Sequence, residues 1–416
     1  MTAELITVGT EILMGNIVNT NAAYLSEMCA RLGLDVYYET TVCDNEKRMY
    51  ETIRTALDRS DIVILCGGLG PTQDDITRET TARVMDLALT EDRHTRKRIE
   101  KYFKTLRGKD YKITKNNWRQ AMVPQGAIVL DNENGTAPGL IVEKKGKTAI
   151  LLPGPPGELK PMFERQVVPY LEKKQSQAIC SCMVKICGIG ESMVETMIED
   201  LISSQKNPTI APYAKVGEVH LRVTACASEE KKAYRLIRPV VKELKKRFGR
   251  HIYTTDEKVT LEESLVAMMA KKKLTLTCAE SCTGGAISAR IVNVPGASDV
   301  LKQGLVTYSN KAKRHYLGVK KETLKSVGAV SRQTAYEMAK GGCRQTGTDA
   351  CIAVTGIAGP GGGTKDKPVG LVYIGCCVNG HVKVTENHFS GNRAKIREQS
   401  VVSALTLLRS CVLKYS

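Results

Sequence analysis

The chain has 416 residues, of which 42% are hydrophobic and 25% are charged. These values are typical of folded globular proteins and exclude a disordered, collagenous or fibrous chain. Because one hydrophobic core rarely extends beyond about 250 residues, this length predicts two or three domains.

The formal net charge of +17 raises the question of a nucleic-acid partner. The basic residues gather on two expected helices, RHTRKRIEKYFKTLRGK and KELKKRFGR, where apolar positions and some acids interrupt them. No helix-turn-helix, zinc-finger or RNP pattern accompanies them, and 5% of aromatic residues is too few for a base-stacking platform. Nucleic acid is therefore not the expected partner, whereas phosphorylated nucleotides would be attracted by this charge.

Fourteen cysteines are present, but they form no CxxC pair and no regular disulfide pattern, so reduced core thiols are expected. The N-terminus lacks a basic region before its apolar run. No later run reaches the roughly 20 apolar residues that a spanning helix needs. These features predict a cytoplasmic protein without a membrane partner.

The first domain is expected over residues 1–172. Short apolar runs alternate with amphipathic stretches in the order ELITVGTEIL, a helix over 21–34, LDVYYETTV, another helix, and DIVILCGGLG. This order predicts βαβαβ with a parallel sheet, and further extended runs up to LLPGPPGE close the domain.

A small α+β domain is expected over residues 173–256, because strand-like and helical stretches alternate there. The third domain, 257–416, begins where Thr260 and Glu263 form a capping-box pattern. Its apolar strands again alternate with helical stretches, as in another α/β domain.

Ser281 stands in CAESCTGGAISARIV, where a buried strand runs through a Gly-rich turn into a helix. A serine at such a junction suits a nucleophile, and Gly284 and Gly285 let backbone N–H groups approach an oxyanion closely. The motif lacks the GxSxG elbow, so an ordinary helix N-cap is the alternative interpretation.

A base for this serine is not found among the histidines, because none lies in a Gly-rich or strand-end motif of the third domain. LVTYSNKAK places Tyr308, Asn310 and Lys311 at the end of another apolar strand, and a desolvated lysine can act as a base. The alternative is a solvated helix start, which the neighbouring Lys313 and Arg314 would favour.

The run AVTGIAGPGGGTKDKPVG follows a further strand and contains six glycines between Gly356 and Gly370. Its backbone N–H groups, together with Lys367, would suit a phosphate, although it matches neither an ATP loop nor a dinucleotide fingerprint. Arg393, just before a helix, would add a bidentate phosphate contact. A flexible turn is the alternative.

In the first domain, Asp74 and Asp75 follow a buried strand and a Gly turn in CGGLGPTQDDIT. Glu11, after the first strand, and Glu158, in LLPGPPGE, belong to the same carboxyl edge of the sheet, where α/β proteins bind ligands. These four carboxylates are the candidate metal ligands. The alternative is that Asp74 caps the helix expected to begin at Ile76.

Taken together and in this order, the motifs resemble the CinA family over essentially the whole chain. The first domain carries GTEILMGNIVNTNAAYL, GGLGPTQDDITRE, NGTAPG and LLPGPPGEL, and the middle domain carries GIGES and NPTIAPYAKVGEV. The last domain carries AESCTGG, GLVTYSNKAK, TGIAGPGGGTKDKPVG and SGNR. The resemblance implies a molybdopterin-binding-like three-layer α/β/α first domain, a small α+β middle domain and a three-layer α/β deamidase domain.

For the last domain the resemblance implies hydrolysis of the amide of nicotinamide mononucleotide to nicotinate mononucleotide and ammonia, in pyridine-nucleotide salvage, without a cofactor. Ser281 would be the nucleophile, Lys311 its base and Tyr308 a hydrogen-bonding partner of the pair. The predicted substrate-binding residues are Thr283, Gly284, Gly285, Asn310, Gly361, Gly362, Thr364 and Arg393.

For the first domain the resemblance implies an ADP-ribose pyrophosphatase that uses a divalent ion (Mg, Mn or Co) on Glu11, Asp74, Asp75 and Glu158. It also suggests a homodimer. Two alternatives remain: binding or adenylylation of molybdopterin by the first domain, and a non-catalytic role in competence or DNA recombination.

Overall fold

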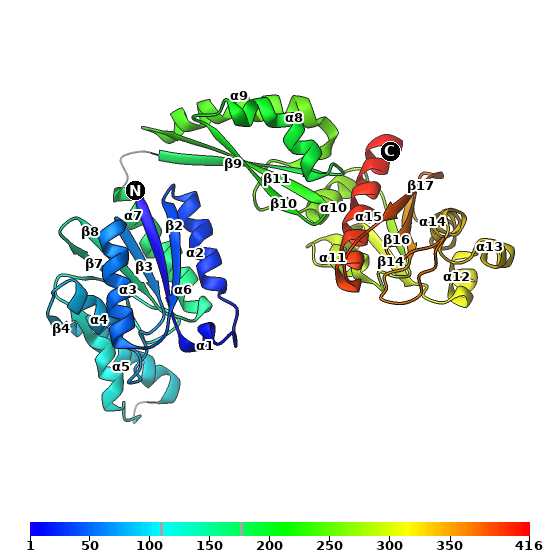
Figure 1. Cartoon of the computed structure of the whole chain (residues 1–416). Helices are drawn as coiled ribbons and strands as arrows, with labels where there is room; N and C mark the ends of the chain where they lie inside the picture. The colour runs from blue at the N-terminus through cyan, green and yellow to red at the C-terminus, as the bar shows by residue number, and fades with distance from the viewer. Residues whose placement is uncertain (109–110, 175–177) are drawn as a thin grey trace. The chain divides into compact units, whose positions relative to one another are not determined.

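The computed structural model describes residues 1–108, 111–174 and 178–416, and Figure 1 shows their helices and strands. The chain divides into two compact units. The N-terminal unit is Met1–Cys180 with Ala227–Glu230, and the C-terminal unit is Ser181–Cys226 with Lys231–Ser416. Across the described residues, no helix is both long and apolar enough to cross a membrane.

The N-terminal unit is built on a six-stranded sheet in the order β2-β1-β3-β8-β7-β6. Strands β2, β1, β3 and β8 are parallel, as the alternating pattern predicts, while β7 and β6 are added antiparallel. The strands are β1 (Thr2–Val8), β2 (Asp35–Val42), β3 (Ile62–Cys66), β6 (Ile128–Leu130), β7 (Gly139–Lys144) and β8 (Lys147–Leu152), and β4 (Leu89–Glu91) pairs with β5 (Met122–Pro124) in a separate hairpin.

Helices cover both faces of this sheet. The helices of this unit are α1 (Thr10–Leu13), α2 (Thr20–Arg31), α3 (Glu46–Arg59), α4 (Thr77–Val84), α5 (Arg93–Arg107), α6 (Pro156–Met162) and α7 (Val168–Lys174), with the short helices η1 (Lys115–Ala121) and η2 (Phe163–Val167). Because side chains alternate along a strand, Ile64 of β3 packs in the core under α2 and α6, and Leu65 packs in the core under α3. The three-layer α/β/α fold is confirmed.

The middle part of the chain forms a four-stranded sheet in the order β10-β11-β9-β12, in which the hairpin β10–β11 and the pair β9–β12 are antiparallel. Two helices accompany this sheet, so the predicted small α+β fold is confirmed. The elements are β9 (Ala178–Cys187), α8 (Glu191–Ser203), β10 (Thr209–Lys215), β11 (Glu218–Ala227), α9 (Glu230–Phe248), η3 (Gly249–His251) and β12 (Ile252–Thr254).

The last part of the chain has a five-stranded sheet in the order β14-β13-β15-β16-β17, parallel from β14 to β15 and antiparallel beyond. Its strands are β13 (Leu276–Glu280), β14 (Leu301–Val306), β15 (Ala350–Gly356), β16 (Leu371–Val378) and β17 (His381–His388). Its helices are α10 (Leu261–Lys271), α11 (Ala286–Val292), η4 (Ala297–Asp299), α12 (Asn310–Leu317), α13 (Lys321–Ser326), α14 (Arg332–Thr346) and α15 (Arg393–Tyr415).

Two cores hold this sheet between layers of helices. Leu265 of α10 and Leu405 of α15 belong to one core, while Leu317 of α12 and Met338 of α14 belong to the other. The capping box of Thr260 and Glu263 is present at the start of α10, as predicted. The three-layer α/β fold of this part is also confirmed.

The close approach of α12 to α14 depends on a residue without a side chain. A methyl group at Gly341 of α14 would overlap the backbone oxygen of Leu317, the last residue of α12. Backbone atoms cannot rotate away as the end of a flexible side chain can, so α12 would have to move. Gly341 therefore helps to fix α12, which carries residues of the candidate site described below.

We predict that Gly341→Ala lowers the free energy of unfolding by about 1–3 kcal/mol, the usual cost of overpacking, despite the better helix propensity of alanine. Chemical denaturation monitored by circular dichroism measures this change. Lys340→Ala on the same helix is the control, and it should change stability by less than about 0.5 kcal/mol. Equal stability of both variants would contradict the overlap.

Candidate functional site

Ser281 follows the last residue of β13, an interior strand between β14 and β15, and is 8% exposed. Its amide donates to the backbone oxygen of Val354 on β15 at 3.0 Å, which extends the strand pairing by one residue. The chain then turns through Gly284 and Gly285, whose φ angles of +62° and +93° favour glycine. A strand end and a glycine turn thus place Ser281 at the carboxyl edge of the sheet, as expected.

The buried carboxylate of Glu280 holds this turn. It accepts hydrogen bonds from the amides of Gly285, Ile287 and Ser288 at 3.0, 3.1 and 2.9 Å, and from the Ser288 hydroxyl at 2.8 Å. The first amides of α11 are therefore satisfied by a charged side chain of the protein itself. This role of Glu280 was not predicted, although a carboxylate at the end of a buried strand, shortly before a helix, is a signal for it.

The two glycine amides expected to face an oxyanion are occupied. Gly285 donates to Glu280, and the amide of Gly284 donates to the backbone oxygen of Ser281 at 3.1 Å. The other amides of the turn, those of Cys282 and Thr283, lie close to the Cys282 sulfur. Burial raises the pKa of that thiol to about 11 and these amides partly offset the rise. Because thiol sulfur is a weak acceptor, these two amides keep hydrogen-bonding capacity for an oxyanion.

Arg397 supports the same turn from α15. Its guanidinium donates to the backbone oxygens of Cys282 at 3.2 Å and Thr283 at 2.7 Å. Thr283 itself is 0% exposed, so its side chain is part of the interior and does not line an open surface. The predicted contact of Thr283 with substrate therefore stays a prediction for its backbone amide alone, not for its side chain.

Lys313, not Lys311, is the lysine beside Ser281. The Lys313 ammonium donates to Ser281 Oγ at 2.8 Å and to the backbone oxygens of Thr307 and Tyr308 at 2.7 and 3.5 Å. Lys313 is 1% exposed, whereas Lys311 is exposed on α12. The predicted pairing of Lys311 with Ser281 is therefore wrong, because the helix turns residue 313 inward together with Leu317, four residues later.

Burial lowers the pKa of Lys313 from 10.5 to about 8, with a small opposing effect of Cys282. The partners of the ammonium are uncharged, so no ion pair compensates for the water that the charge has lost. When neutral, the amine keeps two N–H groups for the backbone oxygens and directs its lone pair at the Ser281 hydroxyl. The pair can therefore exchange a proton near neutral pH.

Tyr308 and Arg393 lie near this site. The Tyr308 side chain is exposed, and its hydroxyl accepts a hydrogen bond from Arg393 at 3.2 Å. Arg393 also donates to the backbone oxygen of Gly359 at 2.8 Å, so it links Tyr308 to the Gly-rich loop. Asn310 is the exposed first residue of α12, which Ser309 caps.

The Gly-rich loop is held by its own residues. The Thr364 hydroxyl accepts from the amide of Lys367 at 3.0 Å, and the Lys367 ammonium donates to the backbone oxygens of Val327 and Val330. Lys367 therefore anchors the loop in place of the phosphate role expected from the sequence. Gly361 and Gly362 lie exposed in the same loop.

The four acidic residues of the N-terminal unit follow parallel strands β1, β3 and β8, at one edge of the sheet. Their hydrogen-bond partners and exposure differ. Asp75 accepts from the amide of Thr72 at 2.9 Å, Glu158 accepts from Asn132 at 2.6 Å, and Glu11 and Asp74 are exposed. Hydrogen bonding from Thr72 lowers the pKa of Asp74, and α4 begins without a side-chain cap, so the capping alternative is not observed.

These carboxylates do not form a preformed metal site. Within residues 1–108, 111–174 and 178–416, no group of three or more His, Cys, Asp or Glu side chains is arranged to hold a metal ion. The four predicted ligands do lie at one edge of the sheet, but their side chains are not arranged to hold an ion together. The divalent ion stays a prediction.

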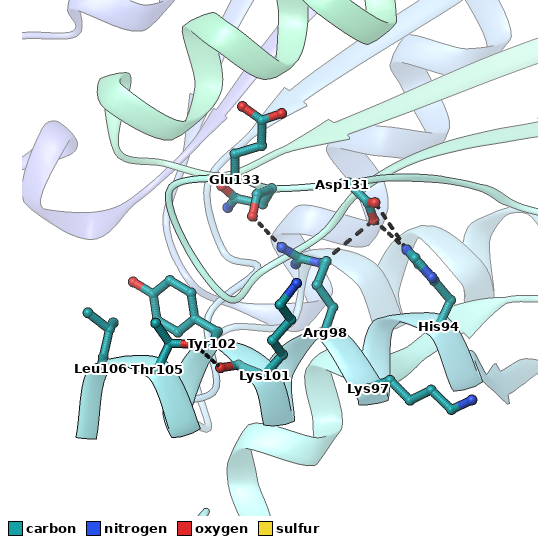
Figure 2. A pocket seen from close by; sticks show the side chains of 10 residues that line it. His94, Lys97, Arg98, Lys101, Tyr102, Thr105, Leu106, Asp131 and Glu133 are labelled. Carbon is teal, nitrogen blue, oxygen red and sulfur yellow. Dashed lines mark hydrogen bonds and ion pairs between the residues drawn. The ribbon is translucent and has the colours of Figure 1, made fainter. Parts of the chain in front are cut away.

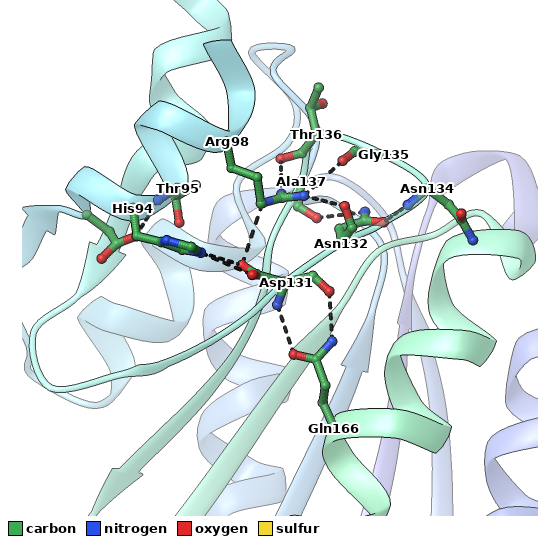
Figure 3. Close-up of polar contacts among 11 residues, drawn as sticks. His94, Thr95, Arg98, Asp131, Asn132, Asn134, Gly135, Thr136, Ala137 and Gln166 are labelled. Carbon is green, nitrogen blue, oxygen red and sulfur yellow. Dashed lines mark hydrogen bonds and ion pairs between the residues drawn. The ribbon is translucent and has the colours of Figure 1, made fainter. Parts of the chain in front are cut away.

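A loop with the sequence DNENGTAP, residues 131–138, lies at the same edge between β6 and β7. Figure 3 shows Arg98 of α5 facing its backbone, where the guanidinium donates to the oxygens of Asn132, Gly135 and Thr136. Asn132 in turn donates to Glu158. Arg98 therefore holds the loop from one side while the loop orients a candidate carboxylate on the other.

A cavity of about 710 Å³ borders this loop, and Figure 2 shows the side chains that line it. His94, Arg98 and Lys101 extend from α5 towards Asp131 and Glu133 of the loop. Asp131 contacts His94 at 3.0 Å and Arg98 at 3.6 Å, so part of the positive charge is already paired. The cavity is large enough for a small organic ligand.

Three known families match this architecture part by part. The family described as "Probable molybdopterin binding domain" matches residues 4–173, the "Damage-inducible protein CinA KH domain" matches 181–254, and the "CinA C-terminal domain" matches 258–412. The protein thus has a molybdopterin-binding-like domain, a KH-like domain and a CinA domain.

The chain belongs to the CinA family. It is 49% identical over 414 residues to a "Putative competence-damage inducible protein" of Clostridium beijerinckii, with 100% of both chains covered. It is 48% identical to a "CinA-like protein" of Kosmotoga olearia, with 99% of both chains covered. A crystal structure of the competence/damage inducible protein CihA from Agrobacterium tumefaciens is 42% identical over 36% of this chain and 96% of that chain, with a TM-score of 0.35.

We predict that the stability of the protein depends on pH through Lys313. Its pKa is about 8 in the folded protein, whereas a solvated lysine of the unfolded chain has the ordinary value of 10.5. Between these values the unfolded chain binds more protons, so stability rises with pH there. We consider the difference in free energy of unfolding, wild type minus Lys313→Met. This difference should not change with pH below pH 8. It should then rise by about 3 kcal/mol up to pH 10.5.

Denaturant unfolding at a series of pH values measures this difference. Lys311→Met is the matched control, because its side chain is exposed on the same helix. Its difference curve should stay flat. A rise for Lys311→Met, or none for Lys313→Met, would contradict the desolvated lysine.

Proposed function

We propose that the C-terminal domain hydrolyses the amide of nicotinamide mononucleotide to nicotinate mononucleotide and ammonia. The hydrogen bond of 2.8 Å between Ser281 and the buried, pKa-lowered Lys313 is the observation that carries this proposal. The amide substrate itself follows from the family resemblance. From the same resemblance we also expect the protein to act in the cytoplasm and to form a homodimer.

In the proposed reaction the neutral Lys313 amine removes the Ser281 hydroxyl proton while Oγ attacks the amide carbon. The resulting oxyanion is stabilised by the amides of Cys282 and Thr283. The C–N bond then breaks, and the Lys313 ammonium gives its proton to the leaving nitrogen, which departs as ammonia. Water attacks the Ser281 ester with Lys313 as base, and nicotinate mononucleotide and free Ser281 are released.

The exposed guanidinium of Arg393 supports a phosphorylated substrate. It stands beside Tyr308 and the Gly-rich loop, and it has N–H groups beyond those given to Gly359 and Tyr308. The substrate phosphate is proposed to bind there, with the nicotinamide ring directed inward to Ser281. No cofactor enters these steps.

We predict that Ser281→Ala and Lys313→Met each lower ammonia release from nicotinamide mononucleotide at least about 1,000-fold, because the two groups act as a unit. Lys311→Met should stay within about threefold of wild type, since its side chain is exposed on the same helix. A coupled ammonia assay measures the rates, and circular dichroism checks that each variant is folded. Loss of activity in Lys311→Met with full activity in Lys313→Met would contradict the proposal.

A second proposed function concerns the molybdopterin-binding-like domain. The resemblance implies ADP-ribose pyrophosphatase activity with a divalent ion, and the alignment of Glu11, Asp75 and Glu158 along one sheet edge supports a site there. Binding or adenylylation of molybdopterin is the alternative for this domain. A non-catalytic role in competence or recombination is the alternative for the whole protein.

We predict that the protein forms AMP from ADP-ribose only with Mg²⁺, Mn²⁺ or Co²⁺ present, and that a chelator stops the reaction. Asp75→Asn should lower this rate at least about tenfold, because it removes a negative charge at the proposed site. Chromatography of the nucleotides measures both effects, with Ser281→Ala as the control that keeps the rate. Turnover in excess chelator, or no turnover with any of the three ions, would contradict the assignment.

A further inference from the structure

A second cavity, of about 500 Å³, lies within the C-terminal unit between the KH-like domain and the CinA domain. The KH-like domain contributes Ile189, Arg250 and His251, and the CinA domain contributes Lys383 of β17 and Thr406 and Arg409 of α15. No residue named above for the Ser281 site lines it. Its volume lies in the range of pockets that bind small organic ligands.

The charge of this cavity is positive. Arg250, His251, Lys383 and Arg409 line it, and no aspartate or glutamate does. For Arg250 and Lys383 no ion pair is found with any of the residues that the structure describes, and both side chains are exposed. Two cations without carboxylate partners from different domains thus converge on one space, which favours an anion there.

Arg409 gives this cavity a defined shape. Its guanidinium donates to the backbone oxygen of Arg250, and to that of Ile252 at 2.8 Å. These bonds tie the segment that carries Arg250 and His251 to α15. The backbone at Arg250 is therefore fixed relative to α15 before any ligand binds, which reduces the cost of ordering this wall of the cavity.

The remaining lining suits a sugar and a base. Thr385, Asn387 and Ser403 offer hydroxyl and amide groups, and Ile189 and Leu407 add apolar surface. Ile189 and Gly190 belong to the turn before α8, a 13-residue helix that starts without a side-chain cap. The positive end of this helix adds to the field of Arg250, Lys383 and Arg409.

We propose that this cavity binds a phosphorylated small molecule of mononucleotide size, with its phosphate held by Arg250 and Lys383. The cations supply the phosphate contacts, and the polar and apolar walls match a sugar and a base. A single nucleotide fits the volume, whereas an extended single strand would need a groove that continues beyond it. The site is separate from the reaction proposed at Ser281.

Isothermal titration of the full-length protein with AMP tests this proposal, with adenosine as the probe that lacks the phosphate. We expect AMP to bind and adenosine to bind at least tenfold more weakly. The double variant Arg250→Ala with Lys383→Ala should weaken AMP binding at this site at least tenfold. Lys325→Ala, an exposed lysine on α13, should bind AMP as the wild type does.

A third variant separates this cavity from the Ser281 site. Arg393→Ala should keep the AMP binding that the double variant loses, because Arg393 lies beside Tyr308 and does not line the cavity. Equal AMP binding by wild type and the double variant would overturn the proposal. It would also be overturned if adenosine bound as tightly as AMP, or if an oligonucleotide but not AMP bound through Arg250 and Lys383.

Discussion

The proposed chemistry depends on one lysine ammonium that has lost its water beside a serine hydroxyl. Lys313 is 1% exposed and has backbone oxygens and Ser281 Oγ as partners, with no carboxylate among them. The lowered pKa of about 8 is the consequence of this burial. A paired or solvated lysine would keep its proton at neutral pH and could not serve as a base. Lys313 therefore lacks a carboxylate partner for a functional reason, and this lowers the stability of the fold.

The rest of the C-terminal domain keeps this pair in place. Glu280 and Arg397 hold the turn after Ser281 from two sides, one through amides and the other through carbonyl oxygens. Gly341 allows α12 to lie close enough to α14 for Lys313 to point inward. The N-terminal unit uses a similar arrangement, in which Arg98 fixes the loop that orients Glu158 through Asn132. In both units a buried or half-buried charge orders a loop at the carboxyl edge of a sheet.

Much of the fold was predictable, because strand alternation, apolar runs and the capping box at Thr260 are local signals. Ser281 was predictable for the same reason, since it ends a buried strand. The lysine was misassigned because the choice between Lys311 and Lys313 depends on the rotation of α12, to which Leu317 is the only local guide. The roles of Glu280 and Arg397 depend on contacts with residues on other elements, and the convergence of Arg250 and Lys383 depends on how two domains pack. Contacts between residues that are distant in the sequence leave no local sequence pattern from which they could be predicted.

In the proposed reaction the neutral form of Lys313 activates Ser281. The most direct test is the pH dependence of kcat/KM for ammonia release from nicotinamide mononucleotide, measured on wild type between pH 6 and pH 10. We expect a rate that rises tenfold per pH unit at low pH and levels off near pH 8, the pKa of Lys313 in the folded protein. A rate that is independent of pH across this range, or that falls as pH rises through 8, would contradict a deprotonated Lys313 as the base.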